Sequence, residues 1–206
     1  TPLILLNPDP LPEWQRNVKQ LSDYILSLTA FTLLIPLSTV LAIMIKFSGR
    51  GPVIYRQERI GQYGRPFRLY KFRSMYDDAE NNGPRLSSYN DERVTPVGRF
   101  MRKHRLDEIP NFINVLKGEM SIVGPRPERE HYMKKIIERA PSYKLLLRIK
   151  PGITSWGQVK FGYASSIDEM IERLDYDLIY LENMSLYVDL KIIIYTTITV
   201  FRGRGV

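Results

Sequence analysis

Apolar residues are grouped most densely between Tyr24 and Ile45, a stretch of 22 residues without a charge. As a straight helix this segment would reach about 33 Å, long enough to cross the hydrocarbon core of a bilayer. Pro36, near its middle, removes one helix hydrogen bond and bends the axis. The pattern predicts either a kinked spanning helix or a helix that enters one leaflet, breaks at Pro36 and returns. Physical reasoning alone favours the spanning helix, and a buried helix of a soluble core is a third interpretation.

The residues before this helix have a different character. The opening TPLILLNPDPLPEW contains four prolines, which suits a linker better than a packed element. Residues 1–20 are therefore expected to be a linker or an N-terminal extension. Residues 21–47 would form the membrane helix, and residues 48–206 would form one further domain.

Two stretches rich in β-branched and aromatic residues follow, VIYRQERIG and RPFRLYKFRSM, joined by a short glycine-bounded connection. This pattern predicts a small β-hairpin. The hairpin would bring five of its cations close together, namely Arg56, Arg59, Arg68, Lys71 and Arg73. They could form a solvated basic edge or, beside a membrane segment, a surface for anionic headgroups or a phosphorylated substrate.

The second half of the chain carries mostly helical patterns. Residues 77–93 are polar and rich in turn formers, as in a surface loop. Thr95 and Pro96 then suit the cap and first turn of a helix over residues 95–105, which has an apolar face opposite four cations and so fits a bilayer interface. The apolar stretch after Lys191 is too short to span and predicts another interfacial or core helix. The expected fold is α+β and mainly helical, with a small β-hairpin and several amphipathic interfacial helices.

Charge is concentrated directly after the apolar segment. The chain has 30 Lys and Arg against 22 Asp and Glu, and residues 46–106 alone hold 14 cations and six anions. The positive-inside rule favours the cytoplasm for this flank, but the other flank carries Arg16 and Lys19 as well as Glu13 and Asp23, so charge alone does not decide the orientation. A non-enzymatic protein that binds anionic lipid would explain both the charge and the apolar segment. A nucleic-acid-binding protein explains the charge but not 22 uncharged residues in a row.

Composition narrows the chemistry that the chain can perform. There is no cysteine, and the only histidines are His104 and His131. Disulfide frameworks, thiolate zinc sites, cysteine nucleophiles and a Ser-His-Asp triad are therefore excluded or nearly so. Catalysis would have to come from carboxylates, cations, hydroxyls or a metal held by oxygen.

The adjacent carboxylates Asp107 and Glu108 are the strongest candidates for such chemistry. They follow a cationic stretch and precede NFINVLKGEM, so they could simply cap the next helix. In the functional interpretation, neighbouring Arg and Lys keep both ionised, so that one can attack phosphorus and the other can hold a divalent cation. Downstream, the prolines on either side of Arg126 restrict the backbone and fix where its guanidinium points, which suits phosphate recognition.

Four long motifs give the chain a resemblance to a known family. They are KFRSM (71–75), RLDEIPNFINVLKGEMSIVGPRP (105–127), KPGITSWGQV (150–159) and YDLIYLENMSLYVDLKIIIYT (176–196). Their sequence and order resemble the bacterial sugar transferases, the monotopic phosphoglycosyl transferases, from about residue 23 to the C-terminus. Several long motifs in one order make this resemblance highly specific.

The resemblance implies an enzyme that transfers a phosphosugar from a UDP-sugar to polyprenyl phosphate, such as undecaprenyl phosphate, and releases UMP. It implies Mg²⁺, a covalent phosphosugar intermediate, and a role in the first membrane step of glycoconjugate assembly (exopolysaccharide, O-antigen or capsule). It also implies a monotopic protein on the cytoplasmic face of the bacterial inner membrane, in contact with lipid and without nucleic acid. Residues 48–206 would then be the catalytic domain.

The matched motifs also imply roles for individual residues. Asp107 would be the nucleophile and Glu108 its partner, and the two would hold Mg²⁺. Lys71 and Arg126 would contact phosphates, and Arg102 would steady the membrane segment or the site. Three further residues are expected at or near the substrate, namely Arg73, Lys160 and Asp177.

Two positions qualify the resemblance. The membrane helix of the family is re-entrant and broken at a proline that Pro36 matches, so the resemblance reverses the physical preference for spanning. Ile35 stands where the family often has serine. After Gln158-Val159 the family often has Gly-Arg-Asn, whereas this chain has Lys160-Phe161-Gly162-Tyr163, so a cation there would have to be Lys160. The sugar, the polyprenol length, a homodimer and what precedes Thr1 stay open.

Overall fold

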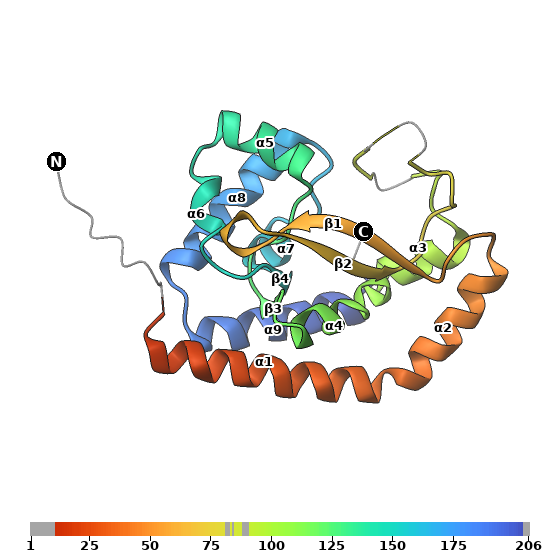
Figure 1. Cartoon of the computed structure of the whole chain (residues 1–206), viewed down its shortest axis with the longest axis horizontal. Coiled ribbons are helices and arrows are strands. Elements are labelled where there is room, and N and C mark those ends of the chain that lie inside the picture. The colour runs from red at the N-terminus through yellow and green to blue at the C-terminus, as the bar shows by residue number, and fades with distance from the viewer. Residues whose placement is uncertain (1–10, 81–82, 84, 88–90, 204–206) are drawn as a thin grey trace.

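A computed structural model describes residues 11–80, 83, 85–87 and 91–203 of the chain. It is mainly helical, with a long bent helix along one side and two small two-stranded sheets in the middle of the molecule, between the bent helix and the helices of the opposite side (Figure 1). The expected α+β class with a small antiparallel hairpin is therefore confirmed. Part of the polar segment 77–93, including Tyr89, lies outside the described residues.

The bent helix consists of α1 (Glu13–Leu33) and α2 (Ile35–Phe47), which meet at Leu34 with a bend of 59°. Pro36 lies in the first turn of α2, where its missing N–H costs little. Thr39 donates its hydroxyl to the backbone carbonyl one turn earlier, at 2.9 Å. Within the described residues no single helix is long and apolar enough to cross a membrane, but α1 and α2 together have that length and composition.

Helix α1 begins earlier than the sequence pattern indicated. Residues 13–20, expected in a linker over residues 1–20, are helical, and Lys19 within them is buried. The proline-rich start explains the boundary, because the Pro12 carbonyl accepts a hydrogen bond from the Arg16 N–H at 3.0 Å and so opens the first turn. Residues 1–10 of that expected linker lie outside the described residues.

The predicted hairpin is present as β1 (Ile54–Ile60) and β2 (Pro66–Phe72), paired antiparallel with Tyr55 opposite Lys71. The short helical turn η1 (Gln62–Gly64) joins them, and Gly64 there has a φ of 72°. Glycine adopts this left-handed conformation at little cost, which explains why the connection contains it.

The chain then builds the rest of the domain from short elements. In order these are α3 (Pro96–Lys103), η2 (Leu106–Glu108), α4 (Asn111–Leu116), β3 (Ser121–Val123), α5 (Glu130–Arg139), α6 (Tyr143–Leu146), β4 (Gly152–Thr154), α7 (Trp156–Lys160), α8 (Ile167–Glu182) and α9 (Leu186–Phe201). The predicted cap of α3 is confirmed, since the Thr95 hydroxyl accepts from the Gly98 N–H at 2.9 Å. Strands β3 and β4 pair in parallel, which brings the segments after residues 123 and 154 to one edge.

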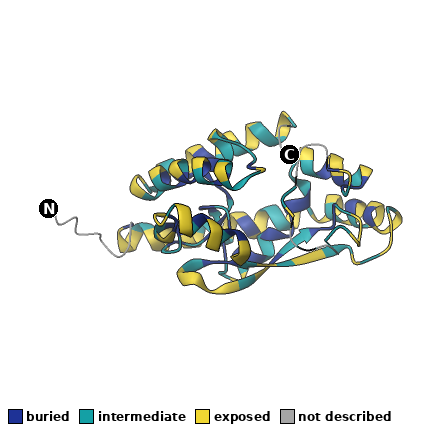
Figure 2. Ribbon diagram, turned by 90° about the horizontal axis from the view of Figure 1, so that it is seen from above, coloured by how far each residue is buried: buried dark blue, intermediate teal, exposed yellow. Residues whose placement is uncertain are grey.

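Apolar packing is divided among several clusters rather than one core. One cluster joins α2, β2 and α3 through Leu41, Ile45, Phe72 and Met101, and Ile109 packs into it directly after η2. Figure 2 shows that the outward faces of the helices are exposed while the facing sides are buried. Large exposed apolar side chains lie on the bent helix and on α9, among them Leu21, Ile25, Leu33, Ile43, Phe47, Leu190, Ile194 and Ile198.

Candidate functional site

The two candidate carboxylates lie on the single turn η2, between α3 and α4. The chain reverses there because Arg105 adopts a left-handed conformation, with a φ of 53°. Both Asp107 and Glu108 are 7% exposed, and Ile109 anchors the end of the turn in the apolar cluster. If the pair only capped α4, its oxygens would accept hydrogen bonds from the first N–H groups of that helix. The structure shows no side-chain cap at the start of α4. The two carboxylates therefore serve another purpose.

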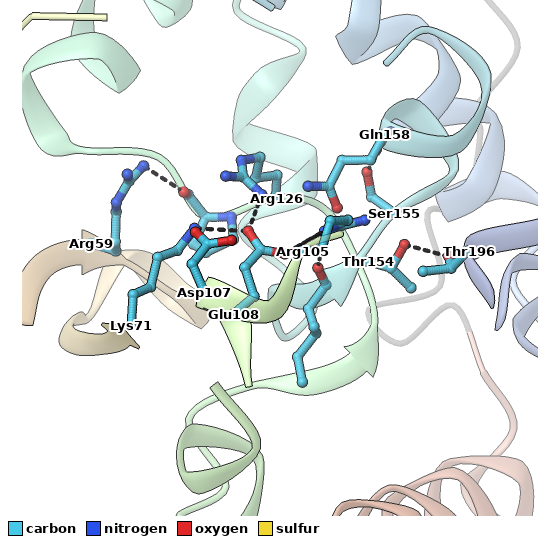
Figure 3. A network of polar contacts seen from close by, with 12 residues as sticks. Arg59, Lys71, Arg105, Asp107, Glu108, Arg126, Thr154, Ser155, Gln158 and Thr196 are labelled. Carbon is cyan, nitrogen blue, oxygen red and sulfur yellow. Dashed lines mark hydrogen bonds and ion pairs between the residues drawn. The ribbon is translucent and has the colours of Figure 1, made fainter. Parts of the chain in front are cut away.

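Glu108 is the centre of a charged cluster (Figure 3). Its Oε1 accepts from Lys71 Nζ at 2.7 Å and from Arg126 at 3.1 Å, and its Oε2 accepts from Arg105 at 2.6 and 2.9 Å. Burial alone would raise the pKa of Glu108, but the attraction of three cations outweighs it and holds the pKa well below the usual value. Glu108 is therefore ionised and already paired by cations from three separate segments.

Asp107 lies beside this cluster with fewer partners. Its nearest cation is Lys71, whose Nζ is 3.9 Å from Oδ2. Burial raises the pKa of Asp107, with a further contribution from the negative charge of Glu108, while Lys71 acts in the opposite direction. Burial likewise lowers the pKa of Lys71. A buried carboxylate with an uncommitted oxygen has the character of a nucleophile rather than of a structural ion pair.

Both carboxylates open into a cavity of about 360 Å³. Its wall is strongly cationic and includes Arg59, Lys71, Arg102, Arg105, Arg126 and Arg129. Aromatic side chains contribute as well, namely Tyr55, Tyr76, Tyr132 and Tyr163. A cavity of this size and charge suits an anionic substrate with an aromatic or sugar component.

Another buried carboxylate, Glu128, holds the loop that carries Arg126 in place. Glu128 accepts from Arg59 of β1 at 3.3 Å and from Arg173 of α8 at 2.7 Å, and Arg59 also donates to the Pro127 carbonyl at 2.9 Å. Glu128 and Arg173 are 4% and 6% exposed. With its backbone fixed by these bonds, Arg126 points at Glu108 and the cavity.

The other expected site residues are distributed between the cavity and its surroundings. Arg102 lines the cavity and donates to the hydroxyls of Ser74 at 2.9 Å and Ser87 at 2.6 Å. Arg73 also borders the cavity, but its guanidinium donates to three backbone carbonyls at and just after the end of α2. Both terminal nitrogens of the Arg73 guanidinium are thus directed at protein carbonyls.

Lys160 and Asp177 lie outside the wall of the cavity. The Lys160 ammonium stands over the rings of Trp156 and Tyr195, at 4.9 and 5.0 Å from their centroids. Asp177 is 3% exposed and accepts from the Gly157 N–H at 2.8 Å, so it secures the start of α7 against α8. Any influence of these two residues on a substrate would be indirect.

Asp177 gives the fold a pH dependence that can be measured. Burial raises its pKa to about 6, although Arg173 and the Gly157 N–H oppose this. In the unfolded chain the Asp177 carboxyl has its ordinary pKa of 3.8, so between pH 3.8 and about 6 the folded state binds more protons than the unfolded state. The free energy of unfolding therefore falls as pH rises from about 4 to about 6. Asp177→Asn should remove this slope and stabilise the protein at pH 7, by up to about 3 kcal/mol.

Unfolding curves collected between pH 4 and pH 7 test the expectation. The exposed Asp175 on α8 offers a matched control, because Asp175→Asn makes the same change of charge without the buried site. A slope that persists in Asp177→Asn would contradict the assignment.

Three further residues of the site carry weaker signals in the sequence. Arg105 is marked only by its position next to the carboxylates, and Arg59 is one of the five hairpin cations that were expected to lie close together. The third is Gln158, which lines the cavity and whose Oε1 is buried without a partner among the described residues. Such an acceptor is available for a hydroxyl or N–H donor on a substrate.

The two carboxylates are also the candidate ligands for a metal ion. Among the described residues no group of three or more histidines and acids is placed to hold a metal ion. Mg²⁺, however, is commonly held by one or two carboxylates together with substrate phosphates. Asp107 and Glu108 fit a Mg²⁺ site of this kind, in which the protein supplies two carboxylates and most of the other ligands arrive with a phosphorylated substrate.

A cationic cavity with two buried carboxylates defines a class of protein that handles anionic groups. A family model described as bacterial sugar transferase matches residues 14–203, and the chain belongs to this family. The sequence resemblance is therefore confirmed.

Curated relatives cover most of the chain. A UDP-N-acetylgalactosamine-undecaprenyl-phosphate N-acetylgalactosaminephosphotransferase of Aeromonas hydrophila is 39% identical over 91% of this chain and 44% of its own length. A UDP-glucose:undecaprenyl-phosphate glucose-1-phosphate transferase of Escherichia coli is 38% identical over 98% of this chain and 43% of its own length. A protein of Caulobacter vibrioides with that same name is 34% identical over 95% of this chain and 75% of its own length. The chain thus spans less than half of the first two relatives.

Proposed function

We propose that this chain transfers a sugar 1-phosphate from a UDP-sugar to polyprenyl phosphate, with undecaprenyl phosphate as the acceptor, and releases UMP. The observation that carries the proposal is the buried Asp107–Glu108 pair in a cation-walled cavity, in a domain that also carries the bent apolar helix. The names of the relatives agree with this reaction, although they include both glucose and N-acetylgalactosamine transferases.

In this mechanism an Asp107 oxygen attacks the phosphorus that bears the sugar, and the bond from that phosphorus to the bridging oxygen of the diphosphate breaks. UMP leaves with that oxygen and its electron pair. An oxygen of polyprenyl phosphate then attacks the phosphorus of the aspartyl phosphosugar, which frees Asp107 and forms polyprenyl-diphosphate-sugar. A carboxylate nucleophile suits this sequence because the acyl phosphate stays reactive toward a second phosphate.

The cations around the carboxylates provide the electrostatic part of catalysis. Lys71 and Arg126 both reach Glu108 Oε1, so an incoming phosphate oxygen could replace that oxygen as their acceptor without a large movement. Arg102 adds a third positive charge on the cavity wall. Mg²⁺, held by Asp107 and Glu108 with the diphosphate, would neutralise the charge that develops on the phosphate oxygens.

We further propose that α1 and α2 form a re-entrant membrane segment, which places both ends of the pair on the cytoplasmic face of the bacterial inner membrane. The 59° bend at Leu34 and the exposed apolar side chains of both arms support this topology. α9, with a second exposed apolar face, would lie at the same interface. The transfer would then be the first membrane step in the assembly of a glycoconjugate.

The topology predicts the result of a labelling experiment. The chain has no cysteine, so single cysteines can be introduced at Gln15 in α1 and at the exposed Glu92 beyond α2. Both variants should react with a membrane-impermeant thiol reagent from the same side of the membrane. Labelling from opposite sides would establish a spanning helix and contradict the re-entrant segment.

A direct test of the function is Mg²⁺-dependent release of UMP in nanodiscs that contain undecaprenyl phosphate. UDP-glucose and UDP-N-acetylgalactosamine are the first donors to compare. The competing function is a lipid-binding protein without catalysis, which the exposed apolar faces and the net charge of +8 would also suit. That protein would bind the same nanodiscs without releasing UMP from any UDP-sugar.

A further inference from the structure

Polar side chains that are buried or half-buried bind both arms of the bent helix to the rest of the domain. On each side, the bound segment lies within a few residues of a cation of the site. On the α2 side the fastening is Arg73, which is 6% exposed. It donates to the carbonyls of Arg50 at 2.6 Å and of Ile45 and Gly49 at 2.8 Å. These carbonyls lie at and just beyond the end of α2, where a cation is favoured by the helix dipole.

Arg73 is also continuous with the strand that carries Lys71. It follows β2 directly, and its own N–H donates to the Val53 carbonyl at 2.9 Å. Lys71 lies two residues earlier on that strand and donates to Glu108 Oε1. The end of α2 and the Lys71 ammonium are therefore joined through one short, hydrogen-bonded segment.

The α1 side is fastened to strand β3. Lys19 donates to the Val123 carbonyl at 3.0 Å, and Asp23, one turn later, accepts from the Ile122 N–H at 3.2 Å and from Ser121 Oγ at 2.7 Å. Lys19 is 9% exposed and also pairs with Asp189 of α9 at 2.6 Å.

This second fastening also ends at the site. The strand that Lys19 and Asp23 hold leads within three residues to Arg126, which donates to the same Glu108 Oε1 that Lys71 does. Two separate paths thus run from the two arms of the membrane helix to cations on one carboxylate oxygen.

We propose that Arg73, together with Lys19 and Asp23, positions Lys71 and Arg126 at a fixed height relative to the membrane segment, so that the phosphate of a lipid acceptor meets Asp107. The inference rests on the proposed function. These three are positioning residues, because their bonds go to backbone or to other protein groups. Their effect should fall on the step that uses a membrane-bound phosphate, since the UDP-sugar arrives from water.

Arg73→Met tests this division between the two half-reactions. In nanodiscs with undecaprenyl phosphate, kcat/KM for the acceptor should fall about 10- to 100-fold, the range expected when reacting groups are displaced by about 1 Å. UMP release in a single turnover without acceptor should stay within about twofold of the wild type. Transfer to a short-chain prenyl phosphate in detergent, where height does not matter, should be affected much less.

Two further variants keep the test decisive. Arg73→Lys retains the charge but cannot reach three carbonyls with one planar fork, so it should give an intermediate loss, and it serves if Arg73→Met does not fold. Lys46→Met removes an exposed cation from the last turn of α2 and should leave the acceptor kcat/KM unchanged.

The outcomes separate this inference from the function on which it rests. If the Arg73 variants match the wild type in nanodiscs, or lose both half-reactions by the same factor, the positioning role is overturned. If the wild type itself releases no UMP, the proposed function is overturned instead.

Discussion

Replacing Asp107 with Asn is expected to reduce phosphosugar transfer by about 10³-fold or more while the protein stays folded and membrane-bound. The amide is nearly isosteric with the carboxylate but cannot form the acyl phosphate. Because the Asp107 contact with Lys71 is long, at 3.9 Å, removing this charge sacrifices little of the ion-pair cluster around Glu108. The loss should therefore appear in kcat and not in stability.

The measurement is a single turnover with labelled UDP-sugar. Wild-type protein should retain the labelled phosphosugar covalently when no acceptor is present, and Asp107→Asn should retain none. Asp175→Asn makes the same substitution at an exposed position on α8 and should behave like the wild type. Full turnover by Asp107→Asn would show that another group is the nucleophile.

Features set by neighbouring residues were predictable from the sequence. The start of α3 was predicted because Thr95 and Pro96 act within one turn, and the hairpin because its two strands are joined by only a few residues. Asp107 and Glu108 were identified for a related reason, since they are adjacent in the sequence and share one turn.

Features set by distant partners were not predictable in the same way. Arg73 and Lys71 are similar cations two residues apart, yet one ends on carbonyls and the other on a carboxylate. Lys19 and Asp189 are 170 residues apart in the sequence, and no periodicity connects them. The choice between phosphate, carboxylate and carbonyl as partner of a cation is made by tertiary packing.

The pairing of Glu108 explains how three cations can lie so close together. Lys71, Arg105 and Arg126 are largely buried and would repel one another, and the ionised Glu108, at 2.6 to 3.1 Å, offsets that repulsion. In the proposed mechanism Glu108 therefore has two roles: it pairs the cations that a phosphate oxygen would meet, and it would share a Mg²⁺ ion. These two roles make different predictions when the charge is removed.

Glu108→Gln should destabilise the protein by about 3–5 kcal/mol, because the Lys71, Arg105 and Arg126 side chains, only 15% to 20% exposed, would be left with only the distant charge of Asp107. For a chain of this length that corresponds to a lower melting temperature by roughly 10 °C. Transfer should also fall by about 10²-fold or more, because the carboxylate that orients the three cations is lost. The variant should need more Mg²⁺ for its residual activity if Glu108 shares the metal.

Thermal melting in detergent and a Mg²⁺ titration of UMP release distinguish the two roles. Glu172→Gln, at an exposed position on α8, removes the same charge and should change neither. A lower melting temperature with an unchanged Mg²⁺ requirement would assign Glu108 to the cation cluster alone. An unchanged melting temperature would contradict the stabilising role of Glu108 in the cluster, because three largely buried cations cannot lose their shared carboxylate without a cost in stability.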